Sequence, residues 1–356
     1  MHKRPSLLIL TNQNTADCLG QIDGYELLTS TSELEFVESV PFRTCRPDTE
    51  NSRDFSRVLE RILASHATHI MIWSPNSFPS NAAEFDILST AIGNRQLIYW
   101  EGDAWGKGKK ITPQMGWWLA RASYVFSVAG FSQTTLLRDH GAKEVPPTLH
   151  TYCHIKFGKF ENYTPEAPTS AACFIGGNHA RVNLPILVGL PGGADRRSLV
   201  RKMRRRLGHE FQVYGPGWPK GWSSGRIPYD QQADYFAQSR VTVNWEHYPT
   251  YWGYFSDRLP IALLTGRPHV TSSQPGLDWA PDGDSGFYHE NSPGGVVSRT
   301  AQLLNDDPAK VAASGLNASR WVSGRLSHRE AARHIMSLCD LGVAPVGRTP
   351  WNLLAS

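Results

Sequence analysis

Short apolar runs alternate with segments of helical spacing along this chain, and that alternation restricts its fold more than any other feature. In the first half, Arg53–Ser65 and Ala82–Ile92 carry apolar residues at helical spacing. The apolar runs around them are Leu7–Leu10, Glu35–Val40, His69–Trp73, Gln96–Trp100 and Tyr124–Ser127. Strands that alternate with helices predict a parallel sheet covered on both faces.

A second series of the same kind follows Lys156–Ser170, a polar stretch with two prolines that we interpret as an interdomain linker. The strands expected there are Ala172–Ile175, Glu210–Tyr214, Val241–Trp245 and His269–Thr271. The expected helices are Asp195–Leu207, Tyr229–Gln238, Asp257–Leu264, Gly295–Leu304 and Pro308–Val322. At 356 residues the chain fits two domains of ordinary size.

The sequence therefore predicts an α/β fold of two Rossmann-like domains whose parallel sheets face each other across a cleft. Ligands in such sheets bind at the carboxyl ends of the strands. We expect an N-terminal acceptor domain over residues 1–160 and a C-terminal donor domain over 161–327. The helix and tail over 328–356 are expected to pack back on the N-terminal domain.

Composition narrows the class of protein. Hydrophobic residues make up 40% of the chain and charged residues 19%, which is typical of a globular protein. The five cysteines are scattered without a CxxC pair, which argues against a disulfide framework or a zinc site and favours reduced, cytoplasmic thiols. No apolar run approaches membrane-spanning length. The net charge of +4 neither requires nor excludes an anionic partner.

Tyr254–Thr271, with the sequence YFSDRLPIALLTGRPHVT, predicts a short helix between a loop and a buried strand. Ser256 and Asp257 are good N-cap residues, and Arg258 falls in the first turn. Unpaired N–H groups in a first turn attract phosphate, and an adjacent arginine strengthens that attraction. An ordinary capped helix without a ligand is the alternative.

Polar or glycine-rich turns follow three more of the predicted strands. FIGGNHARVN places Gly176 and Gly177 after a buried strand and Arg181 before an expected helix. The glycines allow close backbone approach and the arginine can meet a phosphate, but a tight turn without a ligand is equally consistent. YGPGW contributes Tyr214, Gly215 and Trp218, and VTVNWEH ends in Asn244, Glu246 and His247.

Arg196–Arg206 carries seven basic residues on one predicted helix. A solvated helix face is the simpler interpretation, and contact with an anionic acceptor or a nucleic acid is the other.

Carboxylates in the first half provide candidates for a catalytic base. Glu101 and Asp103 follow a predicted strand, and their spacing on an extended chain would place both on one side. Such a carboxylate can accept the proton of an attacking hydroxyl. His150, near the end of the first domain, is a third candidate base, although structural histidines are common.

These motifs, in this order, resemble the CgeB-type (spore-maturation-protein-like) glycosyltransferases of the two-Rossmann glycosyltransferase-B class. The resemblance is carried by FIGG…R, YGPGW, the strand ending in Asn244, YFSDRLPIALLTGRPHV and the tail NDDPAK…RWV…LSHREAA. It covers about residues 120–340.

The resemblance implies sugar transfer from a nucleoside diphosphate sugar to a hydroxyl acceptor, without a metal or a resident cofactor. It places Gly176, Gly177 and Arg181 in a loop facing the cleft. It places Tyr214, Gly215 and Trp218 near the nucleotide, and Ser256, Asp257 and Arg258 near the diphosphate. The chain also departs from the pattern of related retaining enzymes, because Ile261 occupies the position of a glutamate that binds the donor ribose.

Two other functions remain open at this stage. A nucleotide-sugar epimerase with the same fold would alter the donor itself, and a non-catalytic module would bind a nucleotide sugar without turnover. The acceptor is open as well: a small molecule, a glycan or modified DNA. The sequence does not indicate the sugar, the base, the stereochemical course or the oligomeric state.

Overall fold

The computed structural model describes residues 4–12, 19–43, 54–106, 110–183, 186–281 and 285–354. Two compact units make up the chain. The first comprises Met1–Leu149, Cys153–Ile155 and Ser327–Ser356, and the second comprises His150–Tyr152 and Lys156–Leu326. The chain therefore passes between the units near residue 150 and again after Leu326.

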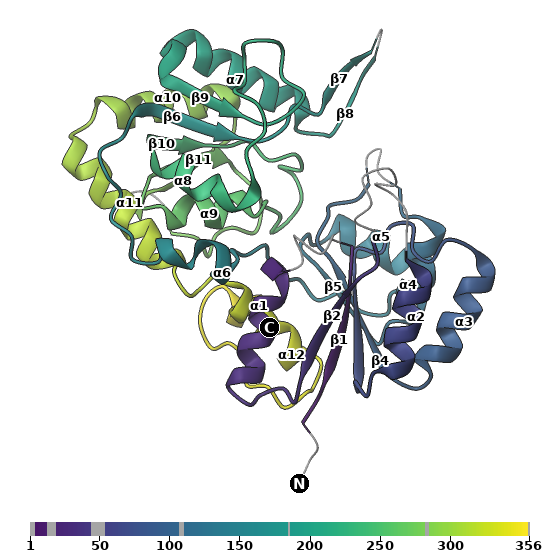
Figure 1. Ribbon diagram of the computed structural model, residues 1–356. Coiled ribbons are helices and arrows are strands. Elements are labelled where there is room, and N and C mark those ends of the chain that lie inside the picture. The colour runs from purple at the N-terminus through teal and green to yellow at the C-terminus, as the bar shows by residue number, and fades with distance from the viewer. Residues whose placement is uncertain are drawn as a thin grey trace. The chain divides into compact units, whose positions relative to one another are not determined.

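Five parallel strands form the sheet of the first unit, in the order β2-β1-β3-β4-β5 (Figure 1). They are β1 (Leu7–Thr11), β2 (Val37–Pro41), β3 (His69–Trp73), β4 (Gln96–Glu101) and β5 (Tyr124–Ser127). The helices are α1 (Leu19–Ser30), α2 (Phe55–Ala64), α3 (Ala82–Ile92), α4 (Pro113–Arg121), α5 (Ser132–Asp139), α12 (His328–Leu338) and α13 (Trp351–Leu354).

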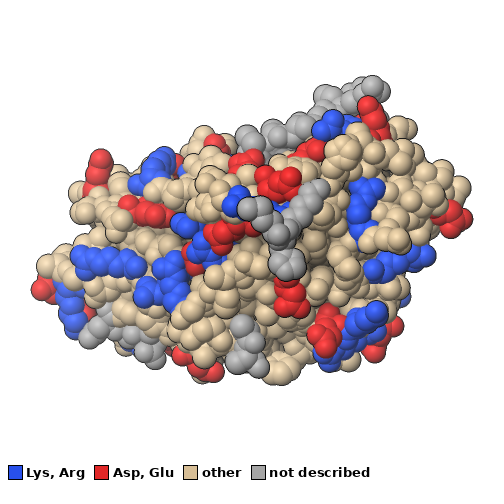
Figure 2. Space-filling model, turned by 90° about the horizontal axis from the view of Figure 1, so that it is seen from below, with Lys and Arg blue, Asp and Glu red and all other residues tan. Residues whose placement is uncertain are grey.

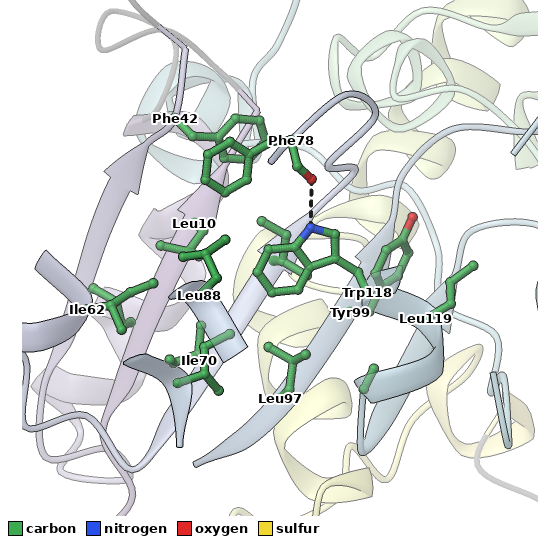
Figure 3. Packing of buried hydrophobic residues seen from close by; sticks show 14 of the residues in the cluster. Leu10, Phe42, Ile62, Ile70, Phe78, Leu88, Leu97, Tyr99, Trp118 and Leu119 are labelled. Atoms are coloured by element: carbon green, nitrogen blue, oxygen red, sulfur yellow. Dashed lines mark hydrogen bonds between the residues drawn. The ribbon is translucent and has the colours of Figure 1, made fainter. Parts of the chain in front are cut away.

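Side chains that alternate along β1 divide between two cores, one on each face of this sheet. Leu8 and Leu10 pack in a cluster with α2, α3 and α4, whereas Leu7 and Ile9 pack with α1 and α12. In the first of these clusters Trp118 donates its indole N–H to the Phe78 carbonyl at 2.8 Å (Figure 3). The near-continuous apolar strands predicted from the sequence are thus explained by burial on both faces.

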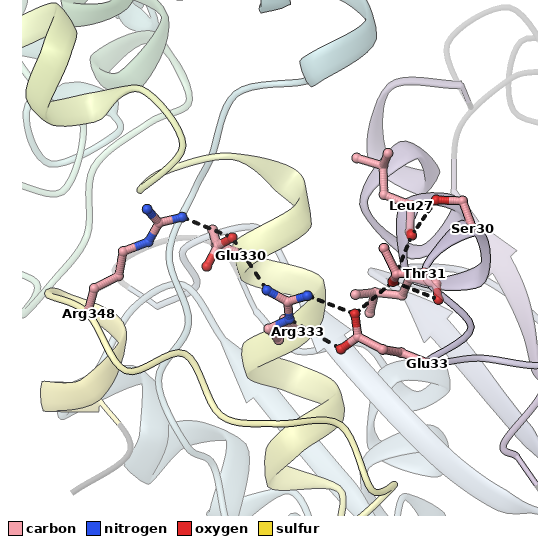
Figure 4. Close-up of polar contacts among 8 residues, drawn as sticks. Leu27, Ser30, Thr31, Glu33, Glu330, Arg333 and Arg348 are labelled. Carbon is pink, nitrogen blue, oxygen red and sulfur yellow. Dashed lines mark hydrogen bonds and ion pairs between the residues drawn. The ribbon is translucent and has the colours of Figure 1, made fainter.

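The C-terminal helix α12 completes the first unit by packing along α1. Tyr25 and Leu28 of α1 share an apolar cluster with Ile335 of α12. Arg333 also forms a 2.7 Å ion pair with Glu33, in the middle of a chain of polar contacts that runs from Arg348 to Thr31 (Figure 4). An ion pair of this exposure contributes about 1 kcal/mol or less, so the apolar contact supplies most of the packing energy.

The second unit repeats the arrangement with the order β12-β11-β10-β6-β9. Its strands are β6 (Ser170–Ile175), β9 (Phe211–Tyr214), β10 (Ser239–Val243), β11 (His269–Ser272) and β12 (Phe287–Glu290), and all pairs are parallel. Its helices are α7 (Gly193–Leu207), α8 (Gln232–Ala237), α9 (Arg258–Leu264), α10 (Pro293–Asn305) and α11 (Pro308–Val322), and the short α6 (His154–Phe157) begins in the first unit. The predicted α/β fold with two parallel sheets is confirmed.

One local prediction is wrong. The sequence led us to expect a helix soon after Arg181, but an antiparallel hairpin of β7 (Ala180–Asn183) and β8 (Ile186–Gly189) comes first. The hairpin extends away from the five-stranded sheet (Figure 1). Arg181 therefore lies on a strand rather than in a loop, and its side chain is outside the described part of the structure.

None of the described helices is both long enough and apolar enough to cross a membrane.

Candidate active site

The carboxyl edge of the second sheet brings together the turns that follow β6, β9 and β10. Strands β6 and β10 are neighbours although β9 lies between them in sequence, so the strand order reverses there. In doubly wound sheets, connections leave on opposite faces at such a switch point and ligands bind beside it. Here the chain after β6 leads to α7, and the chain after β10 leads to α9.

Backbone contacts lock the turns after β6 and β9 together. Gly176 donates its N–H to the Tyr214 carbonyl at 2.8 Å, and Trp218 donates its indole N–H to the Gly176 carbonyl at 2.8 Å. Gly215 has φ of 130°, and a Cβ on it would lie 2.4 Å from the Gly176 oxygen. Only glycine fits there. Trp218 also packs edge-on against Phe174, so its ring belongs to the core of the unit.

Arg196, in the first turn of α7, is an exception to the interpretation of the basic run as a solvated face. Its side chain is 1% exposed and points inward. Nε donates to the Trp245 carbonyl at 2.8 Å and Nη1 to the Gly177 carbonyl at 3.3 Å. Burial lowers its pKa to about 10, against the opposing charge of Glu246, so it stays charged at neutral pH. Nη2 is buried and has no hydrogen-bond partner among the described residues.

His247, which contacts Arg196, offers a second hydrogen-bond donor. Its Nε2 lies 2.5 Å from Nη1 of Arg196, which can only donate, so Nε2 accepts. Burial and the charges of Arg196, His179 and Arg258 lower the pKa of His247 to about 2. The ring is therefore neutral and carries its hydrogen on Nδ1. That nitrogen is buried and unpartnered within the described ranges.

Asn244 and Glu246 follow β10 and form a buried polar pair. Asn244 Nδ2 donates to Glu246 Oε1 at 2.7 Å, and Ser256 Oγ donates to the same oxygen at 3.0 Å. Glu246 N–H is held by Ser272 Oγ at 3.0 Å. The exposed fractions of Asn244 and Glu246 are 2% and 1%. Glu246 Oε2 and Asn244 Oδ1 find no partner in the part of the chain that the structure describes.

The start of α9 lies where the sequence predicts, but its capping differs. Asp257 occupies the N-cap position without a side-chain hydrogen bond, and Ser256 binds Glu246 instead of capping. The prediction of a side-chain cap is therefore wrong. Arg258 is half-buried, 4.0 Å from the Asp257 carboxylate, and its Nε is unpartnered among the described atoms. Ile261 is fully buried and unable to meet a ribose.

His150 belongs to the second unit rather than to the end of the first domain. Its ring lies edge-on to Tyr254, with 6.1 Å between ring centroids. Tyr254 is part of the loop that joins β10 to α9. The structure thus brings this candidate base to the loop that also carries Ser256.

Glu101 and Asp103, in the first unit, differ in burial. Glu101 is the last residue of β4 and is fully buried, whereas Asp103 lies beyond the strand and is exposed. Glu101 accepts hydrogen bonds from Tyr99, Ser74 and the Asp103 N–H at 2.7, 2.8 and 3.0 Å. Burial, reinforced by the charge of Asp103, raises its pKa to about 7. Glu101 therefore positions the Asp103 loop, and Asp103 is the accessible carboxylate.

Within the described residues, one group of side chains has metal-ligating atoms close together: Asp23, Cys153 and His328, all within 4.8 Å of one another. His328 Nδ1 lies 2.7 Å from Asp23 Oδ1, which suits a hydrogen bond better than two ligands of one ion. Asp23 also accepts backbone N–H bonds from Gly24, His154 and Ile155. This group lies in the first unit and its atoms satisfy one another.

Hydrogen-bond donors and acceptors without partners among the described residues therefore lie together at the carboxyl edge of the second sheet. The donors belong to Arg196, His247 and Arg258, and the acceptors to Asn244 and Glu246. Native interiors leave few such atoms without partners, so a polar ligand is expected here. Sequence reasoning named Asn244 and Arg258 but missed Arg196. The available signal was its position in the first turn after the expected strand and glycine turn, ahead of the exposed part of the basic run.

Comparison with known proteins identifies the class of the protein. Residues 196–337 match the family model described as glycosyl transferase-like. The prediction of a glycosyltransferase is confirmed. The matched segment begins at Arg196 and includes Asn244 and Arg258, so the polar cluster lies in the part of the glycosyltransferase that the family model covers. No curated protein matches the chain.

Several solved structures share the fold of the glycosyltransferase. An alpha-glucosyltransferase in complex with UDP-glucose and DNA is 10% identical, with a TM-score of 0.62 over 95% of this chain and 99% of that one. HepE from Anabaena, in complex with UDP and glucose, is 11% identical, with a TM-score of 0.57 over 94% and 99%. A putative UDP-N-acetylglucosamine 2-epimerase from Listeria monocytogenes is 10% identical, with a TM-score of 0.52 over 95% and 96%. Identities this low show the GT-B fold alone.

Proposed function

We propose that the second unit binds the donor, a nucleoside diphosphate sugar, with its diphosphate against Arg258, Arg196 and His247. The observation that carries this proposal is the convergence of three donor groups that have no partner among the described residues, two of them on guanidinium groups. Negative charge grows on the diphosphate as the glycosidic bond breaks, and fixed donors stabilise that charge. The similar HepE structure is in complex with UDP and glucose, and the alpha-glucosyltransferase structure with UDP-glucose, which makes a uridine donor the first to test.

The arginines also supply the positive charge for which other transferases use a divalent cation, so the reaction is proposed to need no metal. Dialysis against EDTA should leave the transfer rate unchanged, and its loss with recovery on adding Mg²⁺ would contradict this part of the proposal. The CgeB-type resemblance supports the same conclusion.

A hydroxyl of the acceptor attacks the anomeric carbon, and its proton passes to a base. Asp103 is the accessible carboxylate at the carboxyl edge of the first sheet, and Glu101 fixes its backbone N–H. His150, beside Tyr254, is the other candidate. Replacing each in turn, Asp103→Asn and His150→Gln, separates them: loss of the base lowers kcat for transfer without weakening donor binding.

Arg258→Ala tests the donor site. We expect UDP-sugar turnover to fall at least about tenfold, because one charge-assisted contact to the diphosphate contributes roughly 1.5–3 kcal/mol. Arg320→Ala, an exposed arginine on α11, is the matched control and should turn over normally. An unchanged rate in Arg258→Ala would exclude the diphosphate assignment.

Incubation of the protein with the donor alone distinguishes the two alternative functions. An epimerase would yield an altered nucleotide sugar, whereas a non-catalytic module would show no hydrolysis of the donor.

We propose DNA as the anionic acceptor, on the basis of the charges on α7. The face of α7 opposite Arg196 exposes Arg201, Lys202, Arg205 and Arg206, and no ion pair involves them within the described residues. Four cations without neutralising partners suit a phosphate backbone. The face shown in Figure 2, by contrast, carries both basic and acidic side chains.

A further inference from the structure

Glu246 is a buried carboxylate with one satisfied and one unsatisfied oxygen. Oε1 accepts from Asn244 and Ser256, whereas Oε2 is buried with no partner among the residues described. An acceptor left in this state costs about 1–3 kcal/mol, more for a charged group. Its neighbour Asn244 leaves a second acceptor, Oδ1, in the same condition.

The nearby charge of Arg196 does not supply the hydrogen-bond partner that Glu246 Oε2 lacks. The charge of Glu246 supports the charged form of Arg196, but the printed hydrogen bonds of the guanidinium go to Trp245, Gly177 and His247. The carboxylate therefore requires a hydrogen-bond donor from outside the described chain. A phosphate cannot supply it, because an ionised phosphate offers only acceptors and repels a carboxylate.

We propose that Glu246 accepts a hydrogen bond from a hydroxyl group of the donor nucleotide sugar and thereby selects ligands that carry this hydroxyl. This inference rests on the proposed function, since it assigns the acceptor atoms of the site whose donor atoms bind the diphosphate. Ribose and the transferred sugar both present hydroxyl groups, and Asn244 Oδ1 can accept from an adjacent one.

Position makes Glu246 suited to this role. Its backbone N–H is tied to Ser272, the last residue of β11, and its Oε1 is tied through Ser256 to the start of α9. A carboxylate held from both sides cannot turn away when its ligand is missing. Sites built to bind a hydroxyl discriminate strongly against analogues that lack it for this reason.

Glu246→Gln is the decisive variant, because it keeps the shape while turning Oε2 into an N–H₂ donor. We expect at least about tenfold weaker binding of UDP-glucose by calorimetry, and inorganic pyrophosphate bound as well as before or more tightly, since a nearby negative charge is gone. Glu290→Gln, a half-buried carboxylate at the end of β12, is the matched control.

Two further ligands identify the hydroxyl. If it belongs to ribose, the variant also loses affinity for UDP, and the wild-type protein binds 2′,3′-dideoxyuridine diphosphate about tenfold more weakly than UDP. If it belongs to the sugar, UDP binding is unchanged in the variant and only UDP-glucose binding weakens. The comparison of ligands on the wild-type protein stands even where the variant folds poorly.

The outcomes separate this inference from the proposed function. Wild-type affinity of Glu246→Gln for UDP-glucose, UDP and pyrophosphate, combined with loss of pyrophosphate binding in Arg258→Ala, would overturn the role of Glu246 and leave the diphosphate site standing. If the wild-type protein binds none of these ligands, the diphosphate site is overturned and the inference with it.

Discussion

Arg196 shows how one side chain can link the fold to the chemistry of the proposed donor site. Its guanidinium bridges the end of β10 and the glycine turn after β6, through the Trp245 and Gly177 carbonyls. Burial keeps His247 neutral, and the charge of Arg196, whose Nη1 faces Nε2, adds to that effect. The planar group makes three contacts at once and still leaves Nη2 for a ligand.

Lysine in place of Arg196 would keep the charge but not this geometry. A single ammonium cannot reach both carbonyls and His247, so Arg196→Lys should lower the free energy of unfolding of the second unit by about 1–3 kcal/mol. Donor affinity should fall as well. Urea unfolding and calorimetry measure the two effects, and Arg205→Lys, on the exposed face of the same helix, should change neither. Equal behaviour of the two variants would contradict the role given to Arg196.

At the scale of elements, the turns after β6 and β9 act as one unit because their backbones touch. Gly215→Ala would force a Cβ to 2.4 Å from the Gly176 oxygen at a φ of 130°. We expect a loss of at least about 2 kcal/mol in unfolding free energy. Donor binding should weaken as well, since the neighbouring turn that would be displaced holds Arg196 through the Gly177 carbonyl.

Gly221→Ala is the control for that loss. Its φ of 76° is also positive, but no atom lies within 4 Å of the added Cβ. Backbone strain alone should cost about 1 kcal/mol there. Similar destabilisation in the two variants would mean that the contact between the turns contributes little.

The exposed basic face of α7 leads to a prediction about the salt dependence of DNA binding. The double variant Arg201→Gln with Arg205→Gln should bind duplex DNA more weakly, with a slope of log K against log salt reduced in magnitude by about 2. Arg320→Gln with Lys310→Gln, on α11, should leave the slope unchanged. Fluorescence anisotropy across about 50 to 200 mM salt measures it. DNA binding that is absent, or indifferent to salt, would exclude this helix as an acceptor surface.

Helices and strands could be predicted from the sequence wherever apolar residues repeat at the spacing of a helix or a strand. Helix α11 begins and ends at the residues predicted, Pro308 and Val322, because a proline start and a continuous apolar face define it. The hairpin of β7 and β8 was missed because its two short strands follow paired glycines and an arginine, which suggest a helix start. Side-chain direction was the harder part. The sequence of α7 shows a basic run, but only packing shows that Arg196 turns inward while Arg205 stays in solvent.

Over the whole molecule, the two places where the chain passes between units are tied to one buried carboxylate. Asp23 on α1 accepts N–H bonds from His154 and Ile155, which adjoin the first crossing, at 2.7 and 3.2 Å. It also pairs at 2.7 Å with His328, the first residue of α12, which follows the second crossing. Asp23 thus connects three segments that are far apart in sequence.

The protonation states of this pair are set by its surroundings. Burial alone would lower the pKa of His328, but hydrogen bonds with Asp23 and Cys153 raise it to about 10. Burial opposes ionisation of Asp23, yet the His328 hydrogen bond and charge and the two backbone N–H groups outweigh it and lower its pKa. Both groups are therefore charged at neutral pH.

Stability of the first unit should depend on pH accordingly. The raised pKa of His328 stabilises the folded state fully below its unfolded value near 6.5, and that contribution is lost as pH rises toward about 10. The lowered pKa of Asp23 adds stability above its unfolded value, which is lost as pH falls through the folded value. The melting temperature should thus decline between about pH 7 and 10.

Asp23→Asn should lower the free energy of unfolding by about 3–5 kcal/mol at neutral pH and flatten that decline in melting temperature. Asp340→Asn, an exposed residue of the same unit, is the control, and a decline of the same steepness in Asp23→Asn would show that another group causes it.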